Sequence, residues 1–198
     1  MLAGRSARNP NVRKVALLIE TSNDYARGLL RGVVAYLREH RPWSLYLAEH
    51  GRGDTPPSWL ANWDGDGIIA RIENPAIARA LRSVKVPVVD VSAARLIPSL
   101  PWVETDDAAI AQAAFEHLRE RGFRNFAYCG DPRFNWSNWR GEHFARAVRV
   151  GGGTCLTYAA SERSAGDDAR EADDIARWLR RLPKPVGVMA CYDLRGVQ

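Results

Sequence analysis

Short apolar segments alternate with amphipathic segments along most of this chain, beginning at Val15. The apolar segments are rich in Val, Ile and Leu and are bounded by polar or turn residues, which is typical of buried β-strands. Strands are therefore predicted at residues 15–20, 44–49, 67–72, 86–92, 125–129, 154–158 and 186–191. The amphipathic segments predict helices at residues 24–40, 57–62, 75–84, 107–121, 137–150 and 169–182.

The helix boundaries coincide with residues that cap helices. Asn74 precedes Pro75, the combination of an N-cap side chain and a proline in the first turn. Gly122 follows the helix at 107–121 as a C-terminal glycine. Asp106 and Asp107 form a pair of carboxylates, but their place before a helix favours capping. Apolar strands separated by helices predict an α/β fold with doubly wound parallel sheets.

The chain is predicted to form two similar lobes, because each half begins with a strand, a polar loop and a helix. Residues 1–12 are expected to be a disordered leader, residues 13–106 the N-terminal α/β lobe and residues 107–198 a partial C-terminal α/β lobe. The second lobe is expected to be incomplete, since the chain ends just after the last predicted strand. A cleft between two lobes is a common ligand site.

Composition restricts the class of protein. The chain has 198 residues, 46% of them hydrophobic and 7 of them Trp, which indicates a globular protein. No apolar run is long enough for a membrane helix, and residues 1–14 lack the apolar core of a secretory signal. We therefore expect a cytoplasmic protein with no membrane partner. The net charge of +5 is spread over helix faces, which favours a solvated surface over a nucleic-acid site.

Catalytic and metal-binding fingerprints are missing from the sequence. Cys129, Cys155 and Cys191 are widely spaced, which favours buried, reduced thiols over a zinc site. The four His residues lack ligand spacing, and no GxGxxG, GxxxxGK[ST] or GxSxG motif is present. We therefore expect no catalytic residue, no metal and no cofactor, and an enzyme is the less favoured alternative.

Polar and aromatic residues follow several of the predicted strands, at the edge where open α/β sheets bind ligands. Each of them alone is better explained as an exposed loop residue or a helix cap, and only their occurrence at one edge of the sheet favours a site. Together, Arg, Asp and Asn beside Tyr and Trp have the chemistry of sugar recognition, in which planar polar groups bind hydroxyls and rings cover C–H faces. The candidate ligand-binding residues are Asn23, Asp24, Tyr25, Arg27, Arg71, Trp136, Arg140, Asp193 and Arg195.

Several of these segments resemble a known family. Residues 15–32, residues 103–118, the pair Arg140 and Phe144, and residues 190–193 are similar to the periplasmic-binding-protein-like effector domains of LacI/GalR-type regulators. The order and spacing of these segments carry the resemblance along most of the chain. It implies two doubly wound lobes with a ligand in the cleft between them.

Four further stretches, at residues 43–49, 63–69, 86–89 and 136–144, are similar to the regulators of xylose operons within this group. That resemblance implies a sugar-sensing effector domain of a bacterial transcription regulator that binds D-xylose or a related pentose. Arg140 and Asp193 would bind hydroxyls, and Trp136 would stack on the sugar ring. The alternative is the sugar-binding protein of a periplasmic transporter, which requires a signal peptide.

The same resemblance also has implications for the domain organisation of the longer protein. LacI-type regulators begin with a helix-turn-helix, for which residues 1–14 are too short, whereas xylose operon regulators resemble fusions that end in an AraC-type DNA-binding domain. We therefore expect the chain to be a fragment whose parent binds DNA through a domain absent here and forms a homodimer.

Overall fold

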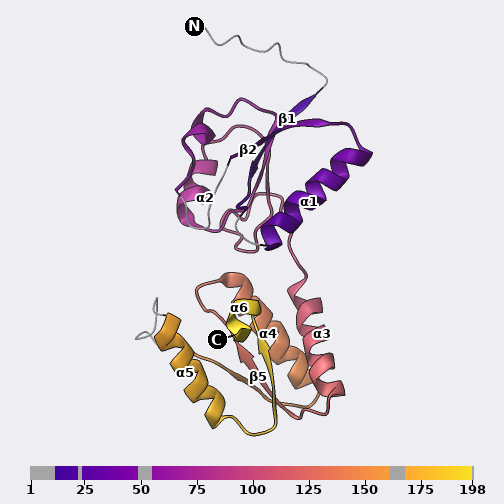
Figure 1. The fold of residues 1–198 in the computed structure, drawn as a ribbon, viewed down its shortest axis with the longest axis vertical. Coiled ribbons are helices and arrows are strands. Elements are labelled where there is room, and N and C mark those ends of the chain that lie inside the picture. The colour runs from indigo at the N-terminus through magenta and orange to yellow at the C-terminus, as the bar shows by residue number, and fades with distance from the viewer. Residues whose placement is uncertain (1–11, 22–23, 49–54, 161–167, 198) are drawn as a thin grey trace. The chain divides into compact units, whose positions relative to one another are not determined.

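The computed structural model describes residues 12–21, 24–48, 55–160 and 168–197. The chain divides into two compact units, an N-terminal unit of Met1–Glu104 and a C-terminal unit of Thr105–Gln198. Each unit consists of a parallel sheet with helices packed on it (Figure 1). The α/β fold class predicted from the sequence is confirmed. The predicted leader falls, except for Val12, outside the described residues.

The N-terminal unit has a four-stranded parallel sheet in the order β2-β1-β3-β4. Its strands are β1 (Arg13–Leu18), β2 (Trp43–Leu47), β3 (Gly67–Ala70) and β4 (Val88–Asp90). Its helices are α1 (Asp24–Glu39), the 3₁₀ helix η1 (Ser58–Asn62) and α2 (Pro75–Leu81). The strand order reverses direction between β1 and β3, so polar loops on either side of this point meet at the carboxyl edge of the sheet.

The C-terminal unit has a three-stranded parallel sheet in the order β6-β5-β7. Its strands are β5 (Asn125–Cys129), β6 (Cys155–Thr157) and β7 (Val186–Ala190). Its helices are α3 (Asp107–Glu120), α4 (Asn135–Val150), α5 (Asp168–Arg181) and the short α6 (Asp193–Val197). Helix α6 forms where the sequence indicated only the first turn of a helix.

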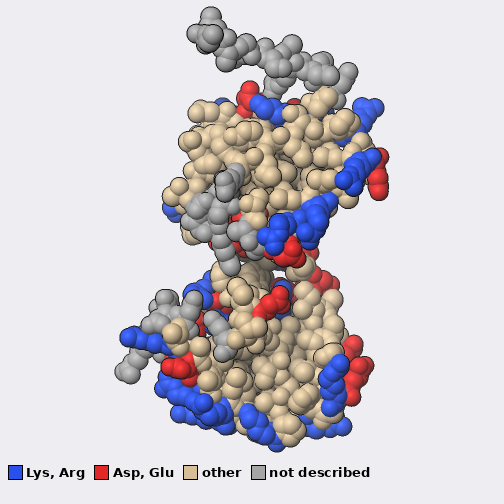
Figure 2. Space-filling model, viewed as in Figure 1, with Lys and Arg blue, Asp and Glu red and all other residues tan. Residues whose placement is uncertain are grey.

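Lys, Arg, Asp and Glu side chains form separate patches on the visible surface of both units, and other residues cover most of the rest (Figure 2). In the part of the chain that the structure describes, no helix combines the length and the apolar character needed to cross a membrane.

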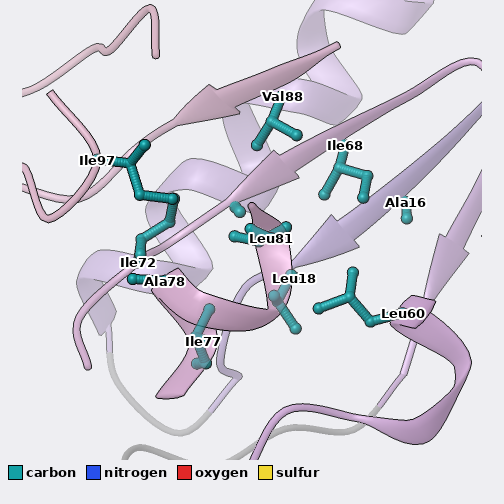
Figure 3. Close-up of a cluster of buried hydrophobic side chains, with 11 residues drawn as sticks. Ala16, Leu18, Leu60, Ile68, Ile72, Ile77, Ala78, Leu81, Val88 and Ile97 are labelled. Atoms are coloured by element: carbon teal, nitrogen blue, oxygen red, sulfur yellow. The ribbon is translucent and has the colours of Figure 1, made fainter. Parts of the chain in front are cut away.

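Alternation along the strands places apolar side chains on both faces of each sheet. In the N-terminal unit, Ala16 and Leu18 of β1 pack with buried residues of α2 and η1, such as Leu81 and Leu60 (Figure 3). The intervening Val15 and Leu17 face the other way and pack with α1. Both faces of β1 are thus covered, which explains why this strand is apolar throughout.

The C-terminal unit follows the same rule. Phe126 and Tyr128 of β5 pack with Phe115 of α3 and Phe144 of α4. Cys129 points to the opposite face and packs in the cluster formed with α5. Helices α3 and α4 therefore cover one face of this sheet and α5 covers the other (Figure 1).

The predicted caps are confirmed. The Asn74 side chain accepts a hydrogen bond from the Ile77 amide at 2.9 Å, and the Asp106 carboxylate accepts from the amides of Ala108 and Ala109 at 3.0 Å. Gly122 has a φ of 85°, the left-handed conformation that favours glycine after a helix. The segment 57–62 differs from its prediction, because a helix this short closes as a 3₁₀ turn.

Candidate functional site

A fixed arginine lies at the carboxyl edge of the C-terminal sheet. Arg140, in the second turn of α4, donates from Nε to Asp107 Oδ1 at 2.8 Å, and its Nη2 lies 2.7 Å from the same oxygen in an ion pair. Its Nη1 donates to the Cys191 carbonyl at 2.6 Å, just after β7 ends. Only 14% of the Arg140 side chain and 8% of the Asp107 side chain are exposed. The guanidinium is therefore held by α3 and β7 while it retains an exposed portion.

Aromatic rings surround this arginine. The Arg140 guanidinium lies 5.1 Å from the centre of the Trp136 ring, one helical turn earlier. Trp136 stacks on Phe134 at 5.4 Å and meets Tyr192 edge-on at 5.8 Å. The structure thus brings together two predicted residues, Trp136 and Arg140, and adds Tyr192, which is not one of the nine ligand-binding candidates.

Asp193 and Arg195, the other two candidates of this unit, have opposite environments. Asp193 begins α6 and is exposed. Arg195 is buried, with 0% of its side chain exposed, and its Nη2 lies 3.2 Å from Asp131 Oδ2 and 3.1 Å from Glu171 Oε1. Arg195 therefore links α6 to the end of β5 and the start of α5, and its guanidinium faces carboxylates rather than solvent.

The carboxylate of Asp131 is held in its ionised form. Burial opposes its ionisation, but hydrogen bonds from Arg133 and the charges of Arg133 and Arg195 outweigh burial and lower the pKa of Asp131. Arg133 binds it with two parallel bonds of 2.8 and 2.6 Å. Glu171 was not selected from the sequence, since nothing in the local pattern of α5 indicates a buried carboxylate.

A buried tyrosine sets the position of the first turns of α4. The Tyr128 hydroxyl donates to the Ser137 carbonyl at 2.6 Å, and Ser137 Oγ accepts from the Asp131 amide at 2.8 Å. A Cβ on Gly141 would lie 2.5 Å from the Tyr128 ring, and one on Gly130 would lie 2.7 Å from it. The glycine inside the predicted helix is the sequence signal that could have revealed this close packing.

The carboxyl edge of the N-terminal sheet also holds an arginine. Arg71, directly after β3, forms an ion pair with Glu20 and a second one with Glu73 at 2.6 Å. Its guanidinium lies 5.0 Å from the centre of the Tyr25 ring, so the structure brings these two predicted residues together. Glu20 and Glu73 were missed, because a carboxylate at a strand end has no pattern of its own.

The remaining candidates of the N-terminal unit lie at the start of α1. Arg27 and Asp24 are exposed and 3.5 Å apart, and Arg27 also donates to the Thr21 carbonyl at 3.2 Å. Asn23 lies outside the described residues.

Asp90, at the end of β4, is a buried carboxylate near this edge. It accepts hydrogen bonds from the amides of Ser92 at 2.8 Å and Ile72 at 3.4 Å. Burial raises its pKa, and the hydrogen bonds from Ser92 and Ile72 only partly offset that rise. The folded state therefore binds the Asp90 proton more tightly than the unfolded state does.

The substitution Asp90→Asn tests whether folding raises the pKa of Asp90, because such a rise makes stability depend on pH. A carboxyl pKa that is raised in the folded state makes the free energy of unfolding fall as pH increases from about 4 through the folded-state pKa. The variant cannot ionise at this position, so its free energy of unfolding does not show this decrease. The difference in free energy of unfolding, variant minus wild type, is therefore expected to increase between about pH 4 and pH 7. Urea denaturation at several pH values measures the difference, and parallel curves for the two proteins would contradict it.

The thiols have the character expected from the sequence. Cys129 and Cys191 are buried and free, and Cys155 is partly buried and free. Burial raises the pKa of Cys129 and of Cys155 to about 11, so neither is a thiolate at neutral pH. Within the described residues, no group of His, Cys, Asp and Glu could hold a metal ion.

Two family models match the chain. Residues 14–108 match the XylR N-terminal domain, and residues 115–198 match the periplasmic binding protein-like domain. The xylose operon regulatory protein of Escherichia coli K12 is 29% identical over 190 residues, which are 92% of this chain and 48% of that protein. This chain is a homologue of the xylose operon regulatory proteins.

Further relatives agree with this assignment. The xylose operon regulatory protein of Haemophilus influenzae is 25% identical over 92% of this chain and 49% of its own length. A solved structure of a xylose-binding transcription activator, XylR, has a TM-score of 0.73 and 28% identity, and the match covers 91% of this chain and 47% of that one. The chain thus spans about half the length of these relatives.

The expectations drawn from the resemblance are confirmed at the level of family and fold. The homologues are named as regulators rather than enzymes, which agrees with the expectation that this homologue is not an enzyme. They do not favour the sugar-binding protein of a transporter. The nine candidate residues remain predictions, and the structure places Arg140 beside Trp136 and Arg71 beside Tyr25.

Proposed function

We propose that this homologue of the xylose operon regulators is a sugar-sensing effector domain and that its ligand is D-xylose or a related pentose. The observation that carries the proposal is the fixed guanidinium of Arg140 beside the Trp136 ring at a carboxyl sheet edge. Such edges are the ligand-binding edges of open α/β sheets.

The hydrogen-bonding capacity of Arg140 supports a sugar ligand. Its guanidinium has five N–H donors in a fixed planar fork. Hydrogen bonds to Asp107 and the Cys191 carbonyl use two of them among the described residues, which leaves donors on Nη1 and Nη2 for a ligand. Two donors in one plane match a pair of neighbouring hydroxyls, and an aromatic ring such as Trp136 covers the C–H face of the sugar.

Carboxylates at the two sheet edges can supply hydrogen-bond acceptors for a sugar. A sugar hydroxyl both donates and accepts, so a site needs acceptors as well as the arginine donors. Asp193 is the exposed carboxylate of the C-terminal edge, and Glu20 and Glu73 flank Arg71 at the N-terminal edge. In the proposal, Asp24 and Arg27 are further candidate contacts at the N-terminal edge, and Arg195 positions α6 from within its carboxylate cluster.

The sensing step follows from differential binding. A sugar that binds one conformation of the regulator more tightly than others would shift the population toward that conformation. The longer regulator would pass this shift to a DNA-binding part. Dimerisation of that regulator stays a prediction.

Asp193→Ala tests the proposal without disturbing a buried group. Calorimetric titration of the chain with D-xylose is expected to show binding, and the variant is expected to bind about 10- to 100-fold more weakly, as for the loss of a hydrogen bond to a charged group. Asp173→Ala, an exposed carboxylate on α5, is the matched control and is expected to bind like the wild type.

The titration also addresses the identity of the sugar. L-arabinose and D-glucose, tested in the same way, are expected to bind more weakly than D-xylose. Equal affinity of Asp193→Ala and the wild type would refute the role of Asp193, and no heat of binding with any of the three sugars would refute the proposed function.

A further inference from the structure

Seven exposed basic residues lie where helices of the C-terminal unit lead into strands. Each of the three connections contributes some of them: the end of α3 before β5, the end of α4 before β6, and the end of α5 before β7. The basic edge, as we call this set, consists of Arg119, Arg121, Arg124, Arg149, Arg180, Arg181 and Lys184.

These connections lie side by side. In a parallel sheet every helix-to-strand connection reaches the amino ends of the strands, which is the edge opposite the candidate sugar residues. Asn125 pairs with Val186 across β5 and β7, and the Asn125 side chain donates to the Pro185 carbonyl at 3.0 Å. Phe126 pairs with Cys155 on the other side of β5. Figure 2 shows Lys and Arg side chains gathered along one end of this unit.

The positive charge of the basic edge is not neutralised locally. Within the described residues, none of its members forms an ion pair, and Glu120 is the one carboxylate in the three connections at residues 119–124, 149–154 and 180–185. Three helix C-termini carry together about −1.5 elementary charges, which offsets only a fraction of seven cations. The amino edge of the N-terminal sheet differs, since Lys14 pairs with Asp64 at 2.6 Å and Arg13 lies 3.7 Å from Asp66.

We propose that the basic edge binds the phosphate backbone of double-stranded DNA without reading its sequence. Six of its seven residues are Arg, whose planar guanidinium binds phosphate oxygens through two parallel hydrogen bonds. The one aromatic residue in the three connections, Phe123, is partly buried against the core of the unit, so no fully exposed ring is available there to stack on single-stranded bases. The inference goes beyond the proposed sugar sensing, because it concerns the opposite edge of the sheet and requires no sugar.

The proposal is tested by fluorescence anisotropy of a labelled DNA duplex of arbitrary sequence, about 30 base pairs long, titrated with the chain at about 50 to 200 mM NaCl. Binding is expected to weaken with salt, with a slope of log K against log salt of about −4 to −6 for seven cations. The triple variant Arg149→Gln, Arg180→Gln, Arg181→Gln is expected to bind about tenfold more weakly at the lowest salt and to reduce the slope by about 2.7.

A matched control is available in the N-terminal unit. Arg38→Gln, Arg79→Gln, Arg82→Gln removes the same charge from exposed positions near the ends of α1 and α2, and it is expected to bind DNA nearly as the parent chain does. Thermal melting of both triple variants checks that they fold, and if the first does not, the single variants Arg149→Gln and Arg181→Gln are each expected to reduce the slope by about 0.9.

Three results would overturn the proposal. The first is no binding at the lowest salt, and the second is an equal loss of affinity in both triple variants, which would indicate net charge alone. The third is equal binding of a fluorescent poly-L-glutamate in place of the duplex, which would identify an acidic protein surface as the partner.

Discussion

Arg195→Met is expected to lower the free energy of unfolding of the C-terminal unit by about 3–5 kcal/mol. The Arg195 side chain is fully buried and neutralises Asp131 and Glu171, which are themselves 0% and 5% exposed. Removing the guanidinium leaves two buried carboxylates with less compensation, and the cost of an uncompensated buried charge is large. Urea denaturation followed by tryptophan fluorescence measures the loss.

Arg133→Met is the matched control for that experiment. Arg133 binds the same Asp131, but half of its side chain is exposed, and solvent screening reduces the contribution of such a pair to about 1 kcal/mol or less. The hydrogen bond to Asp131 raises the pKa of Arg133, so both arginines are charged at all accessible pH values. A similar loss in the two variants would mean that burial does not distinguish their roles.

Arg140→Met is expected to destabilise the C-terminal unit by about 3 kcal/mol and, if the proposed function holds, to abolish detectable D-xylose binding. The variant leaves the buried Asp107 carboxylate and the Cys191 carbonyl without the guanidinium that joins α3, α4 and β7. Chemical denaturation measures the first effect and calorimetry the second.

A double-mutant cycle with Asp107→Ala separates the two effects. The double variant removes both partners, so its stability loss is expected to be smaller than the sum of the single losses by about 1–3 kcal/mol. Sugar binding is expected to remain lost in Arg140→Met whether or not Asp107 is present. Strictly additive losses of stability would contradict the ion pair, and recovery of sugar binding in the double variant would contradict a direct role for Arg140.

The two groups of candidate residues show how far the sequence could predict the site. Tyr25 and Arg71 follow different strands, and Trp136 and Arg140 lie one helical turn apart, so topology and helix periodicity were enough to predict that they lie at carboxyl sheet edges. Their partners were not predictable in this way. Asp107 lies 33 residues before Arg140, and Glu20 lies 51 residues before Arg71.

Arg195 is a second example of an environment that the sequence did not predict. From the sequence it is a polar residue after a strand, equivalent to its neighbour Asp193, and both were selected as ligand-binding candidates. The structure buries one and exposes the other, because α6 turns Arg195 toward the carboxylates of Asp131 and Glu171. A residue's environment depends on which elements pack around it, and a local pattern does not contain that information.

The sequence by itself determined the element order, the parallel α/β class, the helix caps and the family of this chain. The elements and caps depend on local periodicity and on short motifs encoded within a few residues of each other, and the family resemblance depends on the order and spacing of such motifs along the chain. Only the tertiary structure decided which charges are buried and paired, how Tyr128 and Ser137 set the start of α4, and that seven cations share one sheet edge. These properties depend on contacts between distant segments, whose electrostatic strength is set by burial.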